Sequence, residues 1–342
     1  MDFLKLKNHL DKFLPVYVTA GMILGFLFGL HINTKAHSSL FKNLNLIVVI
    51  LMIYPMMINL KLERLKNAAK LWKQLLIALI MGLVLSPILM YVLIEFVGLF
   101  VKVNPNLALG LLLAVVVPCS SMAIAYTGLT DGNIELSTIV VAISFTLAIV
   151  SVPLWMKVFA SSYKINISAW LLVKTILIVV VIPMILGVLT RWYLLNKIGT
   201  ENFLKLKPLF PSVSLLGMYT IVFLIFMEKS RLIASKYAVV GVALIPLILY
   251  YISALFLMIY LDRLLKLPYA DHMGVTFTSV GKNEGTAMAI AMAAGMGLMA
   301  IPPAITPIVQ IPFLVGYVKI ANKIKKLYNE KIDTNKLEKI HE

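Results

Sequence analysis

Charged residues are scarce in this chain, and acidic ones are the scarcest. Asp, Glu, Lys and Arg make up 13% of the 342 residues, whereas a soluble domain carries about a quarter. Hydrophobic residues account for 61%, and the mean hydropathy is +0.95. This composition leaves little room for a soluble domain and predicts an all-α polytopic membrane protein.

The sequence also lacks the residue patterns that metal sites and intramembrane enzymes need. Its single cysteine, Cys119, excludes an intrachain disulfide, and its five histidines show no metal-ligand spacing. It contains no His-Glu-x-x-His run and no nucleophile with a neighbouring base. The 31 basic residues lie mostly at the ends of apolar runs and in the C-terminal tail, not on a basic face with interleaved aromatics. We therefore expect no metal or cofactor, no catalysis and no nucleic-acid partner.

Long apolar runs fill most of the chain. They predict about ten membrane spans of the usual length, at residues 13–31, 43–60, 74–99, 106–129, 135–158, 169–194, 208–227, 237–261, 270–296 and 299–319. In the first span, Gly21, Gly25 and Gly29 recur every four residues. This spacing lets a neighbouring helix backbone approach closely.

The basic residues between the spans are unevenly distributed. With the N-terminus placed in the cytoplasm, the inner segments carry 21 Lys and Arg residues and the outer loops carry 8. The positive-inside rule therefore predicts a multi-pass protein of the cell membrane with both termini in the cytoplasm. In this topology residues 321–342 form a basic cytoplasmic tail.

Two apolar spans contain a short interruption, at Val117–Met122 and at Ser279–Gly285. Pro118 removes a backbone donor from the first, and Gly281 and Gly285 flank the polar residues of the second. Broken helices at membrane depth are tolerated only where they face protein or water. Paired breaks in corresponding positions of two halves mark the binding site of a transporter. We therefore predict one transporter unit, residues 1–342, made of two inverted five-helix repeats, 1–162 and 163–320, with helices four and nine broken.

Candidate substrate-binding residues lie at both breaks. Cys119 follows Pro118 and is joined by the hydroxyls of Ser120 and Ser121, and Asn283 lies at the second break. Thiolate is a soft ligand that suits thiophilic species, and one cysteine allows a transient contact that favours release over storage. The alternative is that Cys119 is a small apolar filler of a membrane helix.

The second break holds two ionisable residues of opposite sign, Lys282 and Glu284. Ionisable side chains at membrane depth usually mark ion or proton pathways. Burial and an adjacent ammonium act on the protonation of Glu284 in opposite directions, so this pair is a candidate for proton coupling. The alternative is a structural ion pair that satisfies the broken backbone. Lys282 could also act as a fixed cation.

Four further ionisable residues lie near the same breaks, namely Asp131, Glu135, Asp271 and His272. The topology places them at the cytoplasmic entrance. We expect them to be solvated loop residues, with a proton-collecting rim as the alternative.

Several motifs resemble the arsenical-resistance permeases of the bile acid/sodium symporter superfamily. They are Leu10-Asp11-Lys12-Phe13-Leu14-Pro15, Leu51-Met52-Ile53-Tyr54-Pro55-Met56 and Val117-Pro118-Cys119-Ser120-Ser121-Met122-Ala123, the last continuing to Asn133. The resemblance covers about residues 10–320. It implies ten spans in a panel and a core domain, with broken helices four and nine crossing in the core. It also implies export of arsenite, driven by inward proton movement, with Cys119 at the family's cysteine position.

The chain departs from this family in the ninth span. Anchored on Asn283, the family's carboxylate position is occupied by Gly285, with Glu284 one residue early and Lys282 where an asparagine is usual. The leading hypothesis is a proton antiporter that exports arsenite or a similar small thiophilic oxyacid across the lipid bilayer. The alternative is a sodium- or proton-coupled transporter of an organic anion, with Lys282 as the anion's partner. The stretch after Cys119 lacks an oxygen ligand set for sodium.

Overall fold

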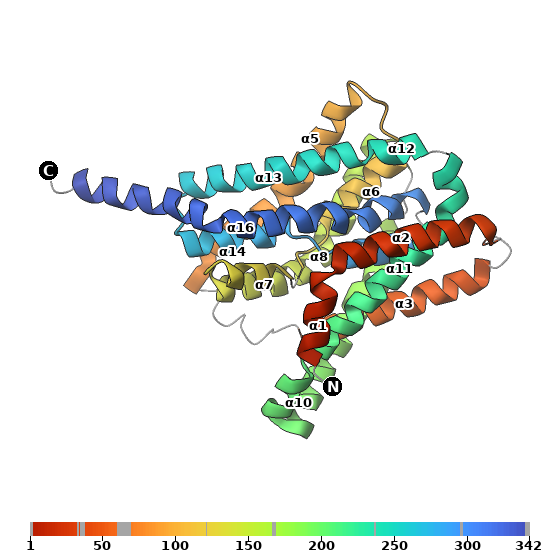
Figure 1. Ribbon diagram of the computed structural model, residues 1–342, viewed down its shortest axis with the longest axis horizontal. Coiled ribbons are helices and arrows are strands. Elements are labelled where there is room, and N and C mark those ends of the chain that lie inside the picture. The colour runs from red at the N-terminus through yellow and green to blue at the C-terminus, as the bar shows by residue number, and fades with distance from the viewer. Residues whose placement is uncertain are drawn as a thin grey trace.

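The structure is a computed structural model that describes residues 3–32, 34, 38–59, 70–120, 122–165, 169–235, 237–294 and 297–338. Within these residues the chain is a bundle of helices (Figure 1). They are α1 (Phe3–Lys12), α2 (Leu14–His31), α3 (Ser38–Ile58), α4 (Trp72–Ile80), α5 (Ser86–Gly98), α6 (Pro105–Val116), α7 (Met122–Leu129), α8 (Ile134–Ser162), α9 (Ala169–Ile176), α10 (Ile182–Leu206), α11 (Leu209–Ser235), α12 (Tyr237–Val242), α13 (Leu244–Leu264), α14 (Tyr269–Val280), α15 (Glu284–Ala293) and α16 (Ile301–Glu338). Two π-helical turns, Met81–Leu85 and Leu177–Val181, join α4 to α5 and α9 to α10.

Eight helical stretches within the described residues are long and apolar enough to cross a membrane. They account for every expected span except 106–129 and 270–296. These two are the spans in which the sequence contains an interruption, and each is divided into two shorter helices, α6 with α7 and α14 with α15. The multi-pass, all-helical architecture is therefore as predicted.

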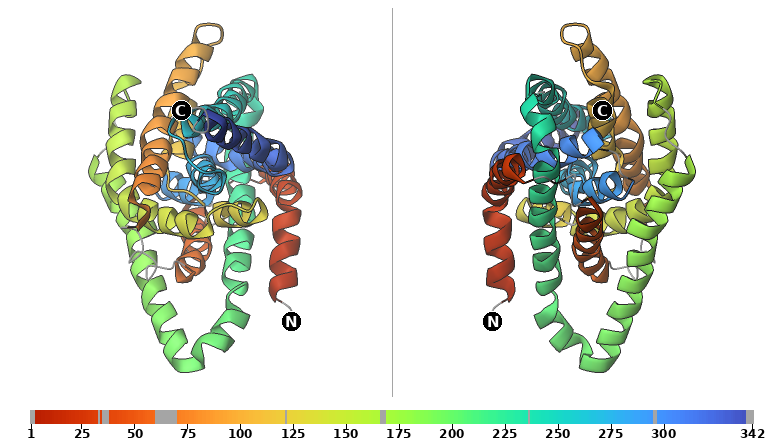
Figure 2. Two further views of the ribbon diagram at one scale, coloured as in Figure 1. Left: turned by 90° about the vertical axis from the view of Figure 1, so that its left-hand side faces the viewer. Right: turned by 90° about the vertical axis from the view of Figure 1, so that its right-hand side faces the viewer.

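The helices pack in two groups. In the first, α11 lies against α1, α2 and α3, and α3 lies against α10. In the second, α14 lies against α4, α7, α8 and α13, while α6 lies against α5, α8 and α16. Figure 2 shows α10 and α11 meeting in a turn that projects away from the second group. The first group holds the first two spans of each predicted half, and the second group holds the remaining three. The division into two inverted repeats stays a prediction.

The glycine stripe of the first span lies where α2 meets α11. A Cβ atom on Gly25 would come within 2.3 Å of the Phe223 carbonyl oxygen, and one on Gly29 within 2.1 Å of the Met227 carbonyl oxygen. Real Cβ atoms do not approach backbone so closely. The prediction that these glycines permit a close helix contact is confirmed.

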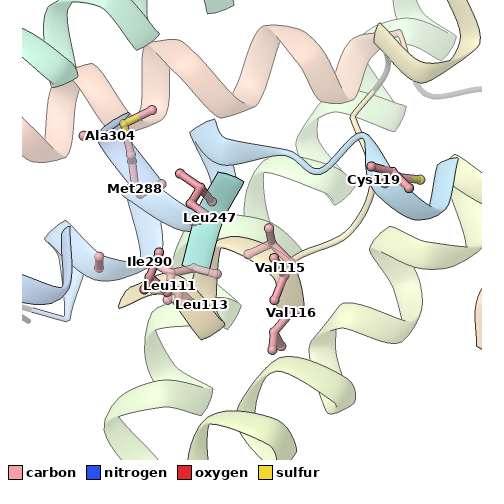
Figure 3. Packing of buried hydrophobic residues seen from close by; sticks show 14 of the residues in the cluster. Leu111, Leu113, Val115, Val116, Cys119, Leu247, Met288, Ile290 and Ala304 are labelled. Carbon is pink, nitrogen blue, oxygen red and sulfur yellow. The ribbon is translucent and has the colours of Figure 1, made fainter. Parts of the chain in front are cut away.

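The buried core lies around the broken helices. Figure 3 shows Leu111 and Leu113 of α6 beside Ile290 of α15, with Val115, Val116 and Cys119 further along the chain. All these residues are at most 2% exposed. Both helices contain long runs of apolar residues, as expected for segments surrounded by protein on every side. The core therefore fixes the position of the two breaks.

Candidate functional site

The two breaks lie side by side and pair through their backbones. The Ser120 amide donates to the Gly281 carbonyl at 2.9 Å, and the Asn283 amide donates to the Pro118 carbonyl at 3.0 Å. Cys119 and Lys282 face each other between these bonds as an antiparallel bridge. Backbone groups that the breaks expose are thereby satisfied without water.

This short ribbon, the paired residues 118–120 and 281–283, has two faces, because residues on either side of a bridge point away from the bridged pair. Directly opposed residues of a bridge place their side chains on the same face. Cys119 and Lys282 therefore share one face, and neither lines the large cavity described below. Their neighbours Ser120 and Asn283 both line that cavity. Ser121, the remaining predicted contact, lies outside the described residues.

The first face of the ribbon holds Lys282, which is 1% exposed. Its Nζ donates a hydrogen bond to the Gly82 carbonyl of the first π-helical turn. An amide at position 87 would donate to the Leu83 carbonyl in an α-helix or to the Gly82 carbonyl in a π-helix. Pro87 has no N–H group, so it donates to neither carbonyl. The Leu83 carbonyl accepts instead from Trp155 Nε1 at 2.8 Å. Lys282 and Trp155 thus satisfy carbonyls that a proline leaves free.

The same face holds Cys119. Its Sγ lies 3.2 Å from Ser144 Oγ, and Ser144 in turn donates to the Val141 carbonyl at 2.9 Å. The thiol is 2% exposed and is packed between α8 and the break. In this conformation the one thiol of the chain is turned away from the cavity.

The second face borders a cavity of about 1030 Å³. It extends from residues of α1, such as the exposed Lys12, to the buried Asn283 and Glu284. Asn283 caps α15, since its Oδ1 accepts from the Thr286 amide at 3.0 Å. Glu284 is 7% exposed, and its Oε1 has no hydrogen-bond partner among the described residues. Glu284 therefore lines the cavity from the first turn of α15, with one carboxyl oxygen buried and without a partner among the described residues.

Lys282 and Glu284 do not form the structural ion pair that the sequence left open. None of the ion pairs found among the described residues joins them. Lys282 points to the π-helical turn, whereas Glu284 borders the cavity. The two charges therefore lie on different sides of the break.

Gln310 of α16 is a residue that sequence reasoning missed. Its Oε1 accepts from the Lys282 amide at 2.9 Å and from the Tyr251 hydroxyl at 2.7 Å, and its Nε2 donates to the Lys282 carbonyl at 3.1 Å. The amide side chain therefore pairs with Lys282 as a neighbouring strand would. An amide between Pro307 and Pro312, in an otherwise apolar run, was the signal in the sequence.

Asp271 and His272, two of the four ionisable residues expected to be solvated, are buried. The prediction of solvated loop residues was wrong for these two. Asp271 is 7% exposed and accepts from Asn133 Nδ2 at 2.8 Å and from Gln74 Nε2 at 3.0 Å. His272 is fully buried, with Nδ1 2.6 Å from Asp262 Oδ2 and Nε2 2.8 Å from the Tyr317 hydroxyl. The hydrogen bonds of Asp271 and His272 therefore join α14 to neighbouring segments. The position of these two residues beside a loop in the sequence does not reveal these contacts.

Residues 46–236 match the sequence profile of the Sodium Bile acid symporter family. The chain belongs to this family. It is 27% identical to the arsenical-resistance protein Acr3 of Corynebacterium glutamicum, over 91% of this chain and 88% of that one. Identity to the arsenical-resistance protein Acr3 of Alkaliphilus metalliredigens is 23%, over 94% of each chain. The uncharacterized sodium-dependent transporter YocS of Bacillus subtilis is 24% identical, over 89% of each.

The resemblance predicted from the Met-Tyr-Pro and cysteine motifs is thus confirmed. Together with the eight apolar helices, the family identifies the chain as a multi-pass membrane transporter. The pair of broken helices with the adjoining cavity is its candidate site.

Proposed function

We propose that this symporter-family member is a proton antiporter that exports arsenite or a similar small, neutral oxyacid. The observation that carries this proposal is the buried Glu284, an ionisable residue that lines a large cavity beside the two paired breaks. Similarity to two arsenical-resistance proteins supports the substrate class. Arsenous acid is largely uncharged at neutral pH, so its binding needs no fixed counter-charge.

Glu284 is the proposed proton-coupling residue. A carboxyl group at this depth can exchange protons with cavity water, and its protonation changes the charge of the site by one. Bound substrate and bound proton then compete for the same end of α15, where Ser120 and Asn283 supply a hydroxyl and an amide. Competition of this kind couples the outward movement of the substrate to the inward movement of the proton.

The remaining predicted residues have proposed roles on the opposite face of the ribbon. Lys282 acts as a fixed cation that holds the break against the π-helical turn. Cys119 contacts the substrate in a second conformation, since its thiol faces Ser144 in this one. The inverted repeat provides that second conformation, in which the cavity opens to the other side. With both termini in the cytoplasm, the cavity beside α1 opens inward.

The alternative is a transporter of an organic anion. Lys7, Lys12 and Lys207 line the cavity and favour this alternative, because they would attract an anion to it. Lys282, the partner that an anion would need at the break, does not line the cavity. The carboxyl of Glu284 borders it instead, which disfavours an anion at that position.

The test uses inverted membrane vesicles from cells that lack their own arsenite exporter. We expect arsenite uptake when the vesicle interior is acidified, loss of uptake with a protonophore, and loss of proton-driven uptake in Glu284→Gln. Glu95→Gln is the matched control, because Glu95 is exposed and accepts from the Tyr163 hydroxyl, far along the chain from the break. No arsenite uptake by correctly inserted wild-type protein, together with uptake of a carboxylate substrate, would establish the alternative.

A further inference from the structure

Methionine is concentrated on the cavity wall. The whole chain contains 18 methionines among 342 residues, yet five of the 35 residues that line the cavity are methionines. They are Met52, Met56, Met57, Met122 and Met218. The thioether sulfur is a soft, polarizable donor that stays uncharged at every pH.

Two of these residues, Met52 and Met56, lie next to the break. They are one turn apart on α3 and so project from the same side of that helix. Met56 Sδ accepts a hydrogen bond from Asn283 Nδ2 at 3.3 Å. Met52 Sδ lies 3.2 Å from the position of a Cβ atom on Gly285. The two sulfurs thus lie beside Asn283 and Gly285, the sequence neighbours of Glu284.

The end of the cavity therefore presents a mixed set of groups. It is lined by Met52, Met56, Glu284 and Ser120, which carry two thioethers, a carboxyl group and a hydroxyl, while the ammonium of Lys282 and the thiol of Cys119 lie on the other face of the ribbon. Hard cations prefer an oxygen cage, and an anion would meet a carboxyl group. A neutral species with a soft central atom and hydroxyl groups matches both kinds of donor.

We propose that Met52 and Met56 are the specificity-determining contacts for a soft, trivalent metalloid hydroxide. Their sulfurs donate electron density to the metalloid atom, and the carboxyl of Glu284 binds a hydroxyl group of the substrate. No bond to oxygen is broken, so binding is rapid and reversible, which suits transport. This inference rests on the proposed function and deepens it, because it replaces the buried thiol with thioethers as the soft contacts in the open conformation.

The test is the Met52→Leu/Met56→Leu double variant in proton-driven vesicle uptake of arsenite and antimonite. Leucine keeps the apolar volume and removes both sulfurs. We expect KM for arsenite to rise about tenfold with kcat nearly unchanged, which corresponds to about 1.4 kcal/mol of lost binding. The increase should be larger for antimony, the softer of the two elements. Met90→Leu/Met156→Leu is the control, since both of these methionines are 0% exposed and neither lines the cavity.

The outcomes separate the two proposals. If the wild type takes up arsenite and the double variant keeps the wild-type KM for both substrates, the methionine contacts are wrong and the exporter proposal stands. An equal rise in KM in the control variant would also overturn the inference, because it would assign the effect to packing. Failure of the inserted wild type to take up either metalloid overturns both proposals.

Discussion

Replacing Gln310 by leucine tests whether one side chain on α16 fixes the geometry of the break. Gln310 makes three hydrogen bonds, two to the backbone of Lys282 and one to the Tyr251 hydroxyl, and it is 4% exposed. Leucine has a similar volume but neither donor nor acceptor. The Lys282 carbonyl and the Tyr251 hydroxyl lose these partners, whereas the Lys282 amide keeps a contact with the Val280 carbonyl at 3.0 Å.

The size of the effect follows from these losses. Two buried polar groups without partners cost about 1–3 kcal/mol each, so Gln310→Leu should destabilise the protein by about 2–6 kcal/mol. Tyr251→Phe removes a single donor and should cost about 1 kcal/mol. From the usual unfolding entropy per residue, Tm should fall by about 3–8 °C for Gln310→Leu and by about 1–2 °C for Tyr251→Phe.

The measurement is thermal unfolding of the detergent-purified protein, followed by arsenite uptake at a temperature well below both transitions. Uptake should fall in Gln310→Leu even where the protein is folded, because Asn283 and Glu284 follow directly on the backbone that Gln310 holds. Ile305→Leu is the control for repacking of α16, because Ile305 is buried and does not line the cavity. A Gln310→Leu variant with wild-type Tm and wild-type uptake would refute the reasoning that this amide fixes the break.

Two further substitutions test the face of the break that holds Lys282 and the contact between α2 and α11. Lys282→Met removes the ammonium from the Gly82 carbonyl and should abolish uptake or make it dependent on an added cation, and unchanged proton-driven uptake in vesicles would exclude Lys282 from the mechanism. Gly25→Ala forces α2 and α11 apart and should lower stability by about 1–3 kcal/mol. Gly21→Ala should have little effect, because its Cβ would meet the Tyr219 carbonyl oxygen at an ordinary 3.4 Å. Equal Tm values for the two alanine variants would contradict this contact.

Much of this architecture could be predicted from local sequence signals. Apolar runs of membrane length are read directly from hydropathy, and the breaks are marked by Pro118 and by polar residues among glycines. The stripe of Gly21, Gly25 and Gly29 predicted a close contact because only small residues permit one. Such signals depend on a few neighbouring residues, so they do not require knowledge of the fold.

Partners supplied by distant helices could not be predicted in this way. His272 and Asp271 looked like loop residues, yet Asp262, Tyr317 and Gln74 reach them from other helices and Asn133 from the N-cap of α8. The hydrogen bonds between Gln310 and Lys282 join a helix to a break 28 positions away in the sequence. A polar side chain in an apolar run shows that a partner exists, because an unpaired group there is costly, but it does not identify the partner.

The role of each break residue depends on a single geometric fact that the sequence does not contain. Residues 118–120 and 281–283 pair in one register, which places Cys119 opposite Lys282. A shift of one residue in that register would exchange the faces, bringing the thiol and the ammonium to the cavity and turning Ser120 and Asn283 inward. Sequence position alone grouped all these residues into one site. The register divides them into a face that satisfies a π-helical turn and a face that borders the cavity, and only the second can meet a substrate in this conformation.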